Sequence, residues 1–145
     1  MDSNAGRFRL LFSLAIAGLL FSGYLSSVRF ISSACAFNEP CPYFLGYPAC
    51  YYGFAMFLAM AITLAQNFFG SISRVRTLSI VLCVSGLGIL FAGYFTSREL
   101  PRLISEGVSS YLLGLPTCAY GLLVYIAIFA ITLAVRRGEL KKIVE

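Results

Sequence analysis

Four long runs of residues without a charged side chain divide this chain and constrain its fold more than any other feature. They cover about residues 10–28, 44–69, 78–97 and 112–135. Each run is close to the roughly 20 residues that a helix needs to cross about 30 Å of hydrocarbon. Helices are expected because backbone polar groups in lipid must be hydrogen-bonded within the segment itself. The sequence therefore predicts an all-α integral membrane protein, a four-helix bundle forming a single transmembrane domain over residues 1–145.

The composition of the chain also indicates a lipid environment. Hydrophobic residues make up 59% of it, only 12% is charged, and the mean hydropathy is +0.86. A soluble domain of this size needs more polar surface. The formal net charge of +5 would suit a nucleic-acid partner, but the basic residues sit at the edges of the apolar runs. Such charges are typical of residues that orient a membrane protein, and we expect no nucleic-acid partner.

The basic residues are distributed unequally between the two sides of the predicted bundle. One side holds most of them: Arg7, Arg9, Arg74, Arg76, Arg136, Arg137, Lys141 and Lys142. The other side holds three, offset by three acidic residues: Arg29, Arg98 and Arg102 against Glu39, Glu99 and Glu106. The positive-inside rule then predicts a multi-pass protein of the cell membrane. Both termini would be cytoplasmic, and the loops at about 29–43 and 98–111 would lie outside.

An alternative interpretation concerns the first apolar run. Arg7 and Arg9, the run itself and then Ala34-Cys35-Ala36 resemble a secretory signal with its cleavage site. We favour a retained helix, because the run is long enough to span the membrane and the same design recurs later in the chain.

Three segments of the first half return in the second half in the same order. They are GLLFSGY at 18–24 and GILFAGY at 88–94, YFLGYPACYYG at 43–53 and YLLGLPTCAYG at 111–121, and AITLA at 61–65 and 130–134. The matches include Pro, Cys and Gly, so we infer a duplication, with repeat 1 at about 8–72 and repeat 2 at about 76–137. Two helices per unit make the repeats parallel, related by an axis along the membrane normal.

Turn-forming residues mark the ends of the predicted helices. Pro48 and Pro116 suit the first turn of the second and fourth helices, where a missing N–H costs little. Gly46 and Gly114 just before them would allow a sharp entrance into each helix. Residues expected to break helices in the loops are Pro40, Pro42, Pro101 and Gly107.

The five cysteines are the residues best suited to chemistry, since the chain has no histidine to bind haem or zinc. Cys83 lies within the third run and is expected to be a small packing residue. The other four are predicted at the outer face. Cys35 and Cys41 would form either a structural disulfide or a pair that exchanges electrons. Cys50 and Cys118 occupy equivalent positions of the two repeats, and whether their sulfur atoms meet is left open.

The first half of the chain resembles the vitamin K epoxide reductase family. The resemblance rests on the GLLFSGYL helix, the segment CAFNEPC at 35–41 and the segment LGYP at 45–48. It implies a four-helix bundle, with Cys35 and Cys41 as the shuttle pair of an outer loop. The family's active site is a C-x-x-C at the outer start of the fourth helix, where this chain reads Leu115-Pro116-Thr117-Cys118. The first active-site cysteine is thus a leucine, and Cys50 is the candidate substitute.

The resemblance further implies a thiol–disulfide oxidoreductase that transfers electrons to a quinone. Cys118 and Cys50 would then be catalytic, and a thioredoxin-like protein on the outer face would be the redox partner. Tyrosines at the same level could hydrogen-bond a quinone carbonyl, or form an interfacial aromatic belt: Tyr47, Tyr51 and Tyr120, with Tyr52 and Tyr111 beside them. We expect no metal and no haem.

Two other functions are compatible with the sequence. The main alternative is a non-catalytic membrane scaffold or an accessory subunit of a larger membrane complex, and lateral association into a homo-oligomer would fit the glycine-rich apolar surface. A small transporter of neutral solutes is the least favoured, because no charged residue lies within any of the four runs.

Overall fold

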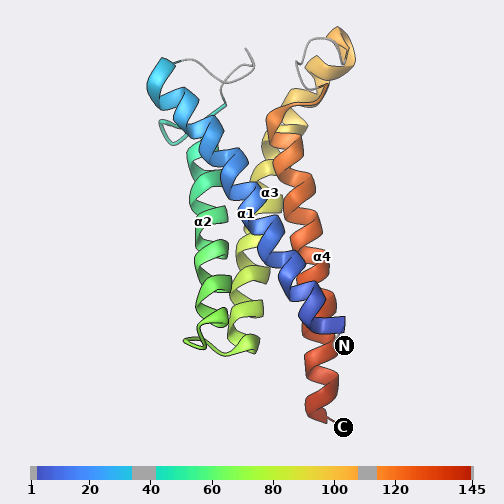
Figure 1. Cartoon of the computed structure of the whole chain (residues 1–145). Helices are drawn as coiled ribbons and strands as arrows, with labels where there is room; N and C mark the ends of the chain where they lie inside the picture. Colours follow the sequence, from blue (N-terminus) through green and yellow to red (C-terminus); the bar gives the residue numbers. More distant parts are fainter. Residues whose placement is uncertain (1–2, 34–41, 108–113, 145) are drawn as a thin grey trace.

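The computed structural model describes residues 3–33, 42–107 and 114–144, which form four helices and one two-stranded hairpin (Figure 1). The elements are α1 (Ser3–Ser32), β1 (Tyr43–Phe44), β2 (Tyr47–Pro48), α2 (Ala49–Phe68), α3 (Arg74–Glu106) and α4 (Thr117–Val144). Each helix contains a stretch long and apolar enough to cross a membrane. The predicted all-α bundle of four membrane-spanning helices is therefore confirmed.

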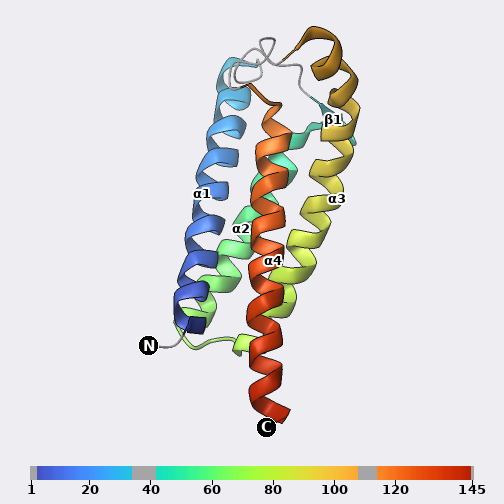
Figure 2. The ribbon, with the colours of Figure 1, turned by 90° about the vertical axis from the view of Figure 1, so that its right-hand side faces the viewer.

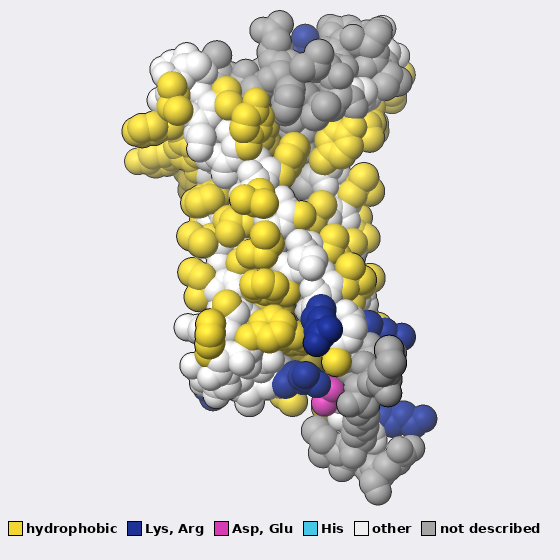
Figure 3. Space-filling model, in the orientation of Figure 1, with side chains coloured by type: hydrophobic (Ala, Val, Ile, Leu, Met, Phe, Trp, Pro, Cys, Tyr) yellow, Lys and Arg dark blue, Asp and Glu magenta, His cyan; other side chains and the backbone are white. Residues whose placement is uncertain are grey.

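The helices form a square in which each has two neighbours. The packed pairs are α1–α2, α2–α3, α3–α4 and α4–α1, so that α2 and α4 stand at opposite corners. Both ends of the chain and the connection between α2 and α3 lie at one end of the bundle (Figures 1 and 2). Basic side chains gather at that end, and apolar side chains cover the middle of the molecule (Figure 3). This distribution is that of a multi-pass membrane protein.

Three of the helices extend beyond the apolar runs that predicted them. α1, α3 and α4 continue into charged flanking residues, because hydropathy marks the stretch in contact with lipid and not the last hydrogen-bonded turn. α2 and α4 begin later than their runs, at Ala49 and Thr117 instead of about residues 44 and 112. At α2 the difference is the hairpin of β1 and β2, in which Tyr43 pairs with Pro48 and Phe44 with Tyr47.

Pro101 does not break the third helix, so that prediction was wrong. It lies inside α3, which continues to Glu106 and ends at Gly107 (φ 78°), whose N–H donates to the Leu103 carbonyl. A proline in a helix removes one hydrogen bond and crowds the preceding turn, which bends the helix without necessarily ending it. The last turns of α3 are indeed turned aside from its axis (Figure 1).

The buried faces of α1 and α3 use the same positions of the two repeats. The buried residues of α1 within the described part are Phe8, Leu11, Ala15, Gly18 and Ser22, and their counterparts Leu78, Val81, Ser85, Gly88 and Ala92 are all buried on α3, together with Thr77 and Phe95. Every pair is displaced by 70 positions, and the alternating spacing of three and four is that of an apolar seam along a helix. The repeat seen in the sequence is therefore also a repeat of the packing.

The buried faces of α2 and α4 correspond with a displacement of 68 positions. The pairs are Phe57 with Tyr125, Met60 with Ile128, and Leu64 with Thr132. The AITLA match at 61–65 and 130–134 is out of this register by one position, and it would pair buried Ala61 with exposed Ala130. The buried positions of α2 and α4 correspond when the repeats are aligned on the proline and cysteine motif. The AITLA segments are therefore similar in sequence but not equivalent in structure.

Two aromatic rings stack at the centre of the bundle, one from each repeat. The ring centroids of Phe57 and Tyr125 are 4.4 Å apart and the planes differ by 10°. Each ring lies on a glycine of its own repeat: a Cβ at Gly18 would be 2.2 Å from the Phe57 ring, and one at Gly88 would be 2.5 Å from the Tyr125 ring. The pseudo-two-fold axis therefore passes between the stacked rings.

Candidate functional site

The two proline–cysteine motifs form corresponding turns at the far end of the bundle from the termini. Gly46 and Gly114 both have left-handed backbone, with φ values of 86° and 80°. Such φ values are strained for any residue with a Cβ. Pro48 is the N-cap of α2, and Pro116 directly precedes α4. Both prolines thus lie one position before the first helical turn that the sequence predicted for them.

The hairpin of β1 and β2 is fixed to the first turn of α2. The Ala49 N–H donates to the Pro42 carbonyl at 2.9 Å, and the Tyr52 hydroxyl donates to the Phe44 carbonyl at 3.1 Å. Arg29 at the end of α1 reaches the hairpin as well, since its guanidinium bonds to the Tyr43 hydroxyl and lies over the Tyr43 ring. These contacts hold the chain that follows Cys41 against the start of α2.

Cys50 and Cys118 occupy matching positions on the diagonal helices. Cys50 is the second residue of α2 and Cys118 the second residue of α4, and both are half-buried. Each precedes the stacked ring of its helix by seven residues, which is about two turns and about 10 Å along the same helix face. No disulfide joins the cysteines within the described ranges. The seven-residue spacing puts each cysteine on the same helix face as the ring two turns away, and the Cys50 side chain lies beside Ser26 of α1.

Two glycines lie between the cysteines and the stacked rings, Gly53 on α2 and Gly121 on α4. A Cβ at Gly53 would meet only the Tyr125 hydroxyl, at 4.0 Å, and a Cβ at Gly121 would meet no atom of the described residues within 4 Å. The Tyr125 hydroxyl donates to the Gly53 carbonyl at 3.3 Å. Tyr125 therefore links α4 to the backbone of α2 at the level between the cysteines and the rings.

The three tyrosines proposed for quinone binding lie on different parts of the molecule. Tyr47 is exposed on the hairpin, Tyr51 faces the groove between α1 and α2, and Tyr120 contacts the Phe21 ring where α4 meets α1, at 6.5 Å between centroids. The symmetry-related pair is Tyr52 of α2 with Phe91 of α3, at 5.5 Å between centroids. Paired rings of this kind suit the packing of neighbouring helices.

Tyr125 is a residue that the sequence analysis missed. It is 2% exposed and its hydroxyl donates to the Gly53 carbonyl of α2. The available signal was the repeat itself: Tyr125 stands where repeat 1 has Phe57, so one member of an apolar pair has gained a hydroxyl.

The remaining predicted residues lie elsewhere. Cys35, Cys41 and Tyr111 are outside the described residues. Cys83 is exposed on α3, so the expectation that it packs inside was wrong. It falls between buried Val81 and Ser85, off the buried seam, and faces outward. Within the described ranges, no three His, Cys, Asp or Glu side chains come together as metal ligands would.

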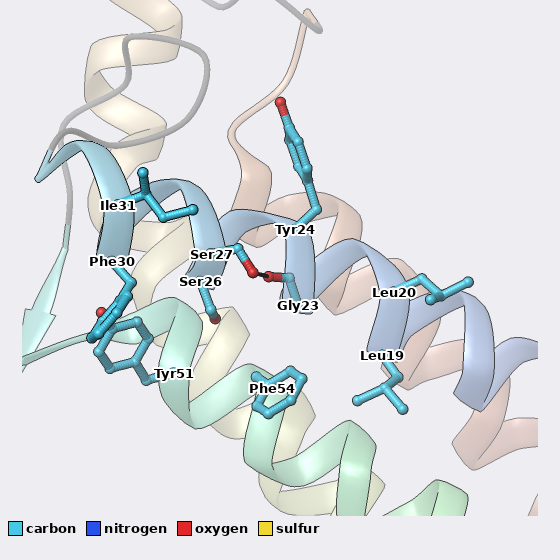
Figure 4. A pocket seen from close by; sticks show the side chains of 10 residues that line it. All are labelled: Leu19, Leu20, Gly23, Tyr24, Ser26, Ser27, Phe30, Ile31, Tyr51 and Phe54. Carbon is cyan, nitrogen blue, oxygen red and sulfur yellow. Dashed lines mark hydrogen bonds between the residues drawn. The ribbon is translucent and has the colours of Figure 1, made fainter.

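Two apolar grooves open on the sides of the bundle. One lies between α1 and α2 and has a volume of about 670 Å³ (Figure 4). The other lies between α2 and α3, measures about 500 Å³, and is lined by aromatic residues that include Phe44, Tyr52 and Phe91. Both volumes are in the range of sites for small organic molecules, roughly 300–1,000 Å³.

In comparisons with protein-family models, with curated proteins and with solved structures, nothing matches this chain. The function is therefore argued from the site alone.

Proposed function

We propose that the chain is a membrane thiol–disulfide oxidoreductase that passes two electrons from thiols on the outer side of the membrane to a lipid-dissolved quinone. The observation that carries the proposal is the placement of Cys50 and Cys118. They are the second residues of repeat-equivalent helices, each about two turns from the stacked ring of its helix, and both are half-buried.

The reaction is a dithiol oxidation coupled to quinone reduction. The Cys50 and Cys118 thiols lose two electrons and two protons and form a disulfide. The quinone takes up both electrons and both protons and leaves as the hydroquinone. The dithiol of Cys35 and Cys41 then reduces the Cys50–Cys118 disulfide by thiol–disulfide exchange through a mixed disulfide. A thioredoxin-like protein on the outer face would reduce the Cys35–Cys41 disulfide in turn, with its own dithiol oxidised.

The proposal includes an orientation and a role for Tyr125. Both termini are cytoplasmic, since the basic end of the bundle carries them and basic flanks stay inside. The cysteine motifs then lie at the outer face, where oxidising conditions permit disulfides. The Tyr125 hydroxyl donates to the Gly53 carbonyl and so holds α4 against α2 between the cysteines and the stacked rings.

The experiment is a quinone-reduction assay with the full chain in liposomes. Dithiothreitol supplies the electrons and the absorbance of the quinone is followed. Cys50→Ser and Cys118→Ser should each lower the rate at least about a hundredfold, because the exchange needs both sulfur atoms. Cys83→Ser is the matched control and should retain the wild-type rate, since Cys83 faces outward from α3. Equal rates for Cys118→Ser and the wild type would refute the proposal.

Mass mapping of the thiols separates this function from a structural role. After one addition of quinone to the reduced protein, a peptide pair linked through Cys50 and Cys118 should be found. If the protein is a scaffold or accessory subunit, both thiols should stay reduced and no quinone should be consumed.

A further inference from the structure

Three buried polar atoms at the basic end of the bundle have no hydrogen-bond partner among the described residues. They are the hydroxyl of Thr77 on α3, the hydroxyl of Thr132 on α4 and Nε of Arg136 on α4. Both threonines are 0% exposed. Leaving a buried donor without an acceptor is costly, so these three groups need an acceptor that the described residues do not supply.

The three groups belong to neighbouring positions of two packed helices. α3 and α4 pack against each other, and their register at this end is fixed by the ion pair of Arg74 with Glu139, at 3.4 Å. Thr77 follows Arg74 by three residues and Arg136 precedes Glu139 by three, so in antiparallel helices the two lie at the same level. Thr132 lies one turn from Arg136 on the same face of α4.

Repeat 1 has apolar side chains where α4 has this polar pair. Leu64 of α2 is the counterpart of Thr132, and Phe68 is the counterpart of Arg136. Leu64 is fully buried, and the Phe68 ring packs edge-on against that of Phe8 at 5.4 Å between centroids. Packing at this level of the bundle therefore does not require polar side chains, and repeat 2 differs from repeat 1 in having them.

The N-terminus of α3 lies beside the same groups, and its positive end is not neutralised by the chain. The N-cap residue Ser73 makes no side-chain capping bond, and the first turn has no acidic residue. Arg74 and Arg76 stand in that turn instead, although the helix dipole disfavours cations there. The Thr77 side chain tilts toward this turn, because the Cα–Cβ bonds of a helix point toward its N-terminus. Backbone N–H groups at such a helix end bind anions.

The surroundings of these groups are positively charged (Figure 3). Within the described residues of this end, Glu139 is the one acidic side chain, and it is paired with Arg74. The basic residues of α3 and α4 here are Arg74, Arg76, Arg136, Arg137 and Lys141. The charge-free run of α3 begins at about residue 78, so the cluster lies at the membrane boundary, where the headgroups of lipids are found.

We propose that the basic ends of α3 and α4 form a binding site for the phosphate group of an anionic membrane lipid. The Thr77 hydroxyl, Arg136 and the first N–H groups of α3 donate to the phosphate oxygens, and Thr132 extends the site by one turn. Free phosphate offers the same oxygens, but the position at the membrane boundary favours the lipid. The inference is independent of the thiol reaction proposed above.

The test measures lipid binding by the full chain in dodecyl maltoside micelles. Dioleoyl phosphatidylglycerol is titrated into the protein, and the rise of the thermal unfolding midpoint gives the Kd, because a ligand of the folded state stabilises it. Dioleoyl phosphatidylcholine, whose headgroup has no net charge, and inorganic phosphate are titrated in parallel. Phosphatidylglycerol should raise the midpoint at concentrations at which the other two leave it unchanged.

Thr77→Val and Arg136→Lys should each raise the Kd for phosphatidylglycerol about tenfold, as expected for the loss of a hydrogen bond to a charged group. Neither substitution changes the net charge, so a general attraction between the basic end and anionic lipid is retained. Without lipid, Thr77→Val should unfold at the wild-type temperature or above it, because it removes a buried hydroxyl that no described residue bonds.

Thr96→Val is the matched control. Thr96 is on the same helix and its hydroxyl is also buried without a partner among the described residues, but it lies toward the opposite end of the bundle. This variant should bind phosphatidylglycerol as the wild type does. The proposal is overturned if Thr77→Val and Arg136→Lys keep the wild-type Kd, or if Thr96→Val weakens binding as much as Thr77→Val. An equal rise of the midpoint with inorganic phosphate or with phosphatidylcholine would also overturn it, since the site would then not select an anionic lipid.

Discussion

The ring of Phe57 lies parallel to that of Tyr125, with centroids 4.4 Å apart, although the two residues belong to helices at opposite corners of the bundle. Each ring comes this close to the axis because the neighbouring helix of its own repeat has a glycine beneath it, Gly18 for Phe57 and Gly88 for Tyr125. The centre of the protein is thus made of two glycine–aromatic contacts and the one stacking contact between them. The contribution of each of these contacts to the stability of the protein can therefore be measured separately.

Replacing Gly18 by alanine should destabilise the protein by about 1–3 kcal/mol, the usual cost of overpacking a core. The new Cβ would lie 2.2 Å from the Phe57 ring, so either the ring or the helix must move. Gly88→Ala should have a similar effect through the Tyr125 ring. Unfolding by sodium dodecyl sulfate in mixed micelles measures the change. Gly6→Ala is the control on α1, because nothing lies within 4 Å of the added Cβ. A loss for Gly18→Ala no larger than for Gly6→Ala would contradict the packing.

Tyr125→Phe should cost only about 0.6 kcal/mol, the average for a hydrogen bond within a membrane protein. The substitution removes the donor to the Gly53 carbonyl and leaves the stacked ring in place. The double variant Phe57→Tyr, Tyr125→Phe moves the hydroxyl to the repeat-equivalent position near Gly121, where no described atom opposes it. We expect the double variant to recover the lost stability in the same unfolding assay. Failure to recover it would mean that the two repeats differ in packing at this level.

The orientation is tested with single cysteines in a background without the native ones. Ser33→Cys lies at the end of α1 and Ser71→Cys in the connection between α2 and α3, and both positions are exposed. In intact cells a membrane-impermeant maleimide should label Ser33→Cys and leave Ser71→Cys unlabelled until the membrane is opened. The reverse pattern would place the termini outside and the cysteine motifs in the cytoplasm.

The fold could be predicted from the sequence because lipid imposes a simple rule on a spanning segment. Four uncharged runs of the right length leave few structures other than four helices. The same rule does not predict the residues at which a helix begins and ends. It could not show that α3 continues through Pro101, because a proline removes one hydrogen bond of a helix without necessarily ending it. It also placed the start of the second helix too early, since a hairpin of Tyr43, Phe44 and Tyr47 is as apolar as a helix turn.

The candidate site was only partly visible in the sequence. The repeat correctly put Cys50 and Cys118 at equivalent positions, because a duplicated motif folds in the same way twice. The tyrosines were chosen by their level in the membrane, which says nothing of the side of the helix on which they lie. Tyr125 was missed because it lies well inside an apolar run, where a residue is expected to belong to the core. Its seven-residue spacing from Cys118 shows that the two residues lie on the same face of α4.

The Gly18–Phe57 contact lies entirely within the first half of the chain and the Gly88–Tyr125 contact entirely within the second. The first hairpin can therefore form its own close-packed contact without any residue of the second half. The second hairpin repeats the same step, and the stacking of Phe57 on Tyr125 joins two finished units. Assembly of this protein is then a docking of preformed halves, and two separately expressed halves should find each other in the bilayer.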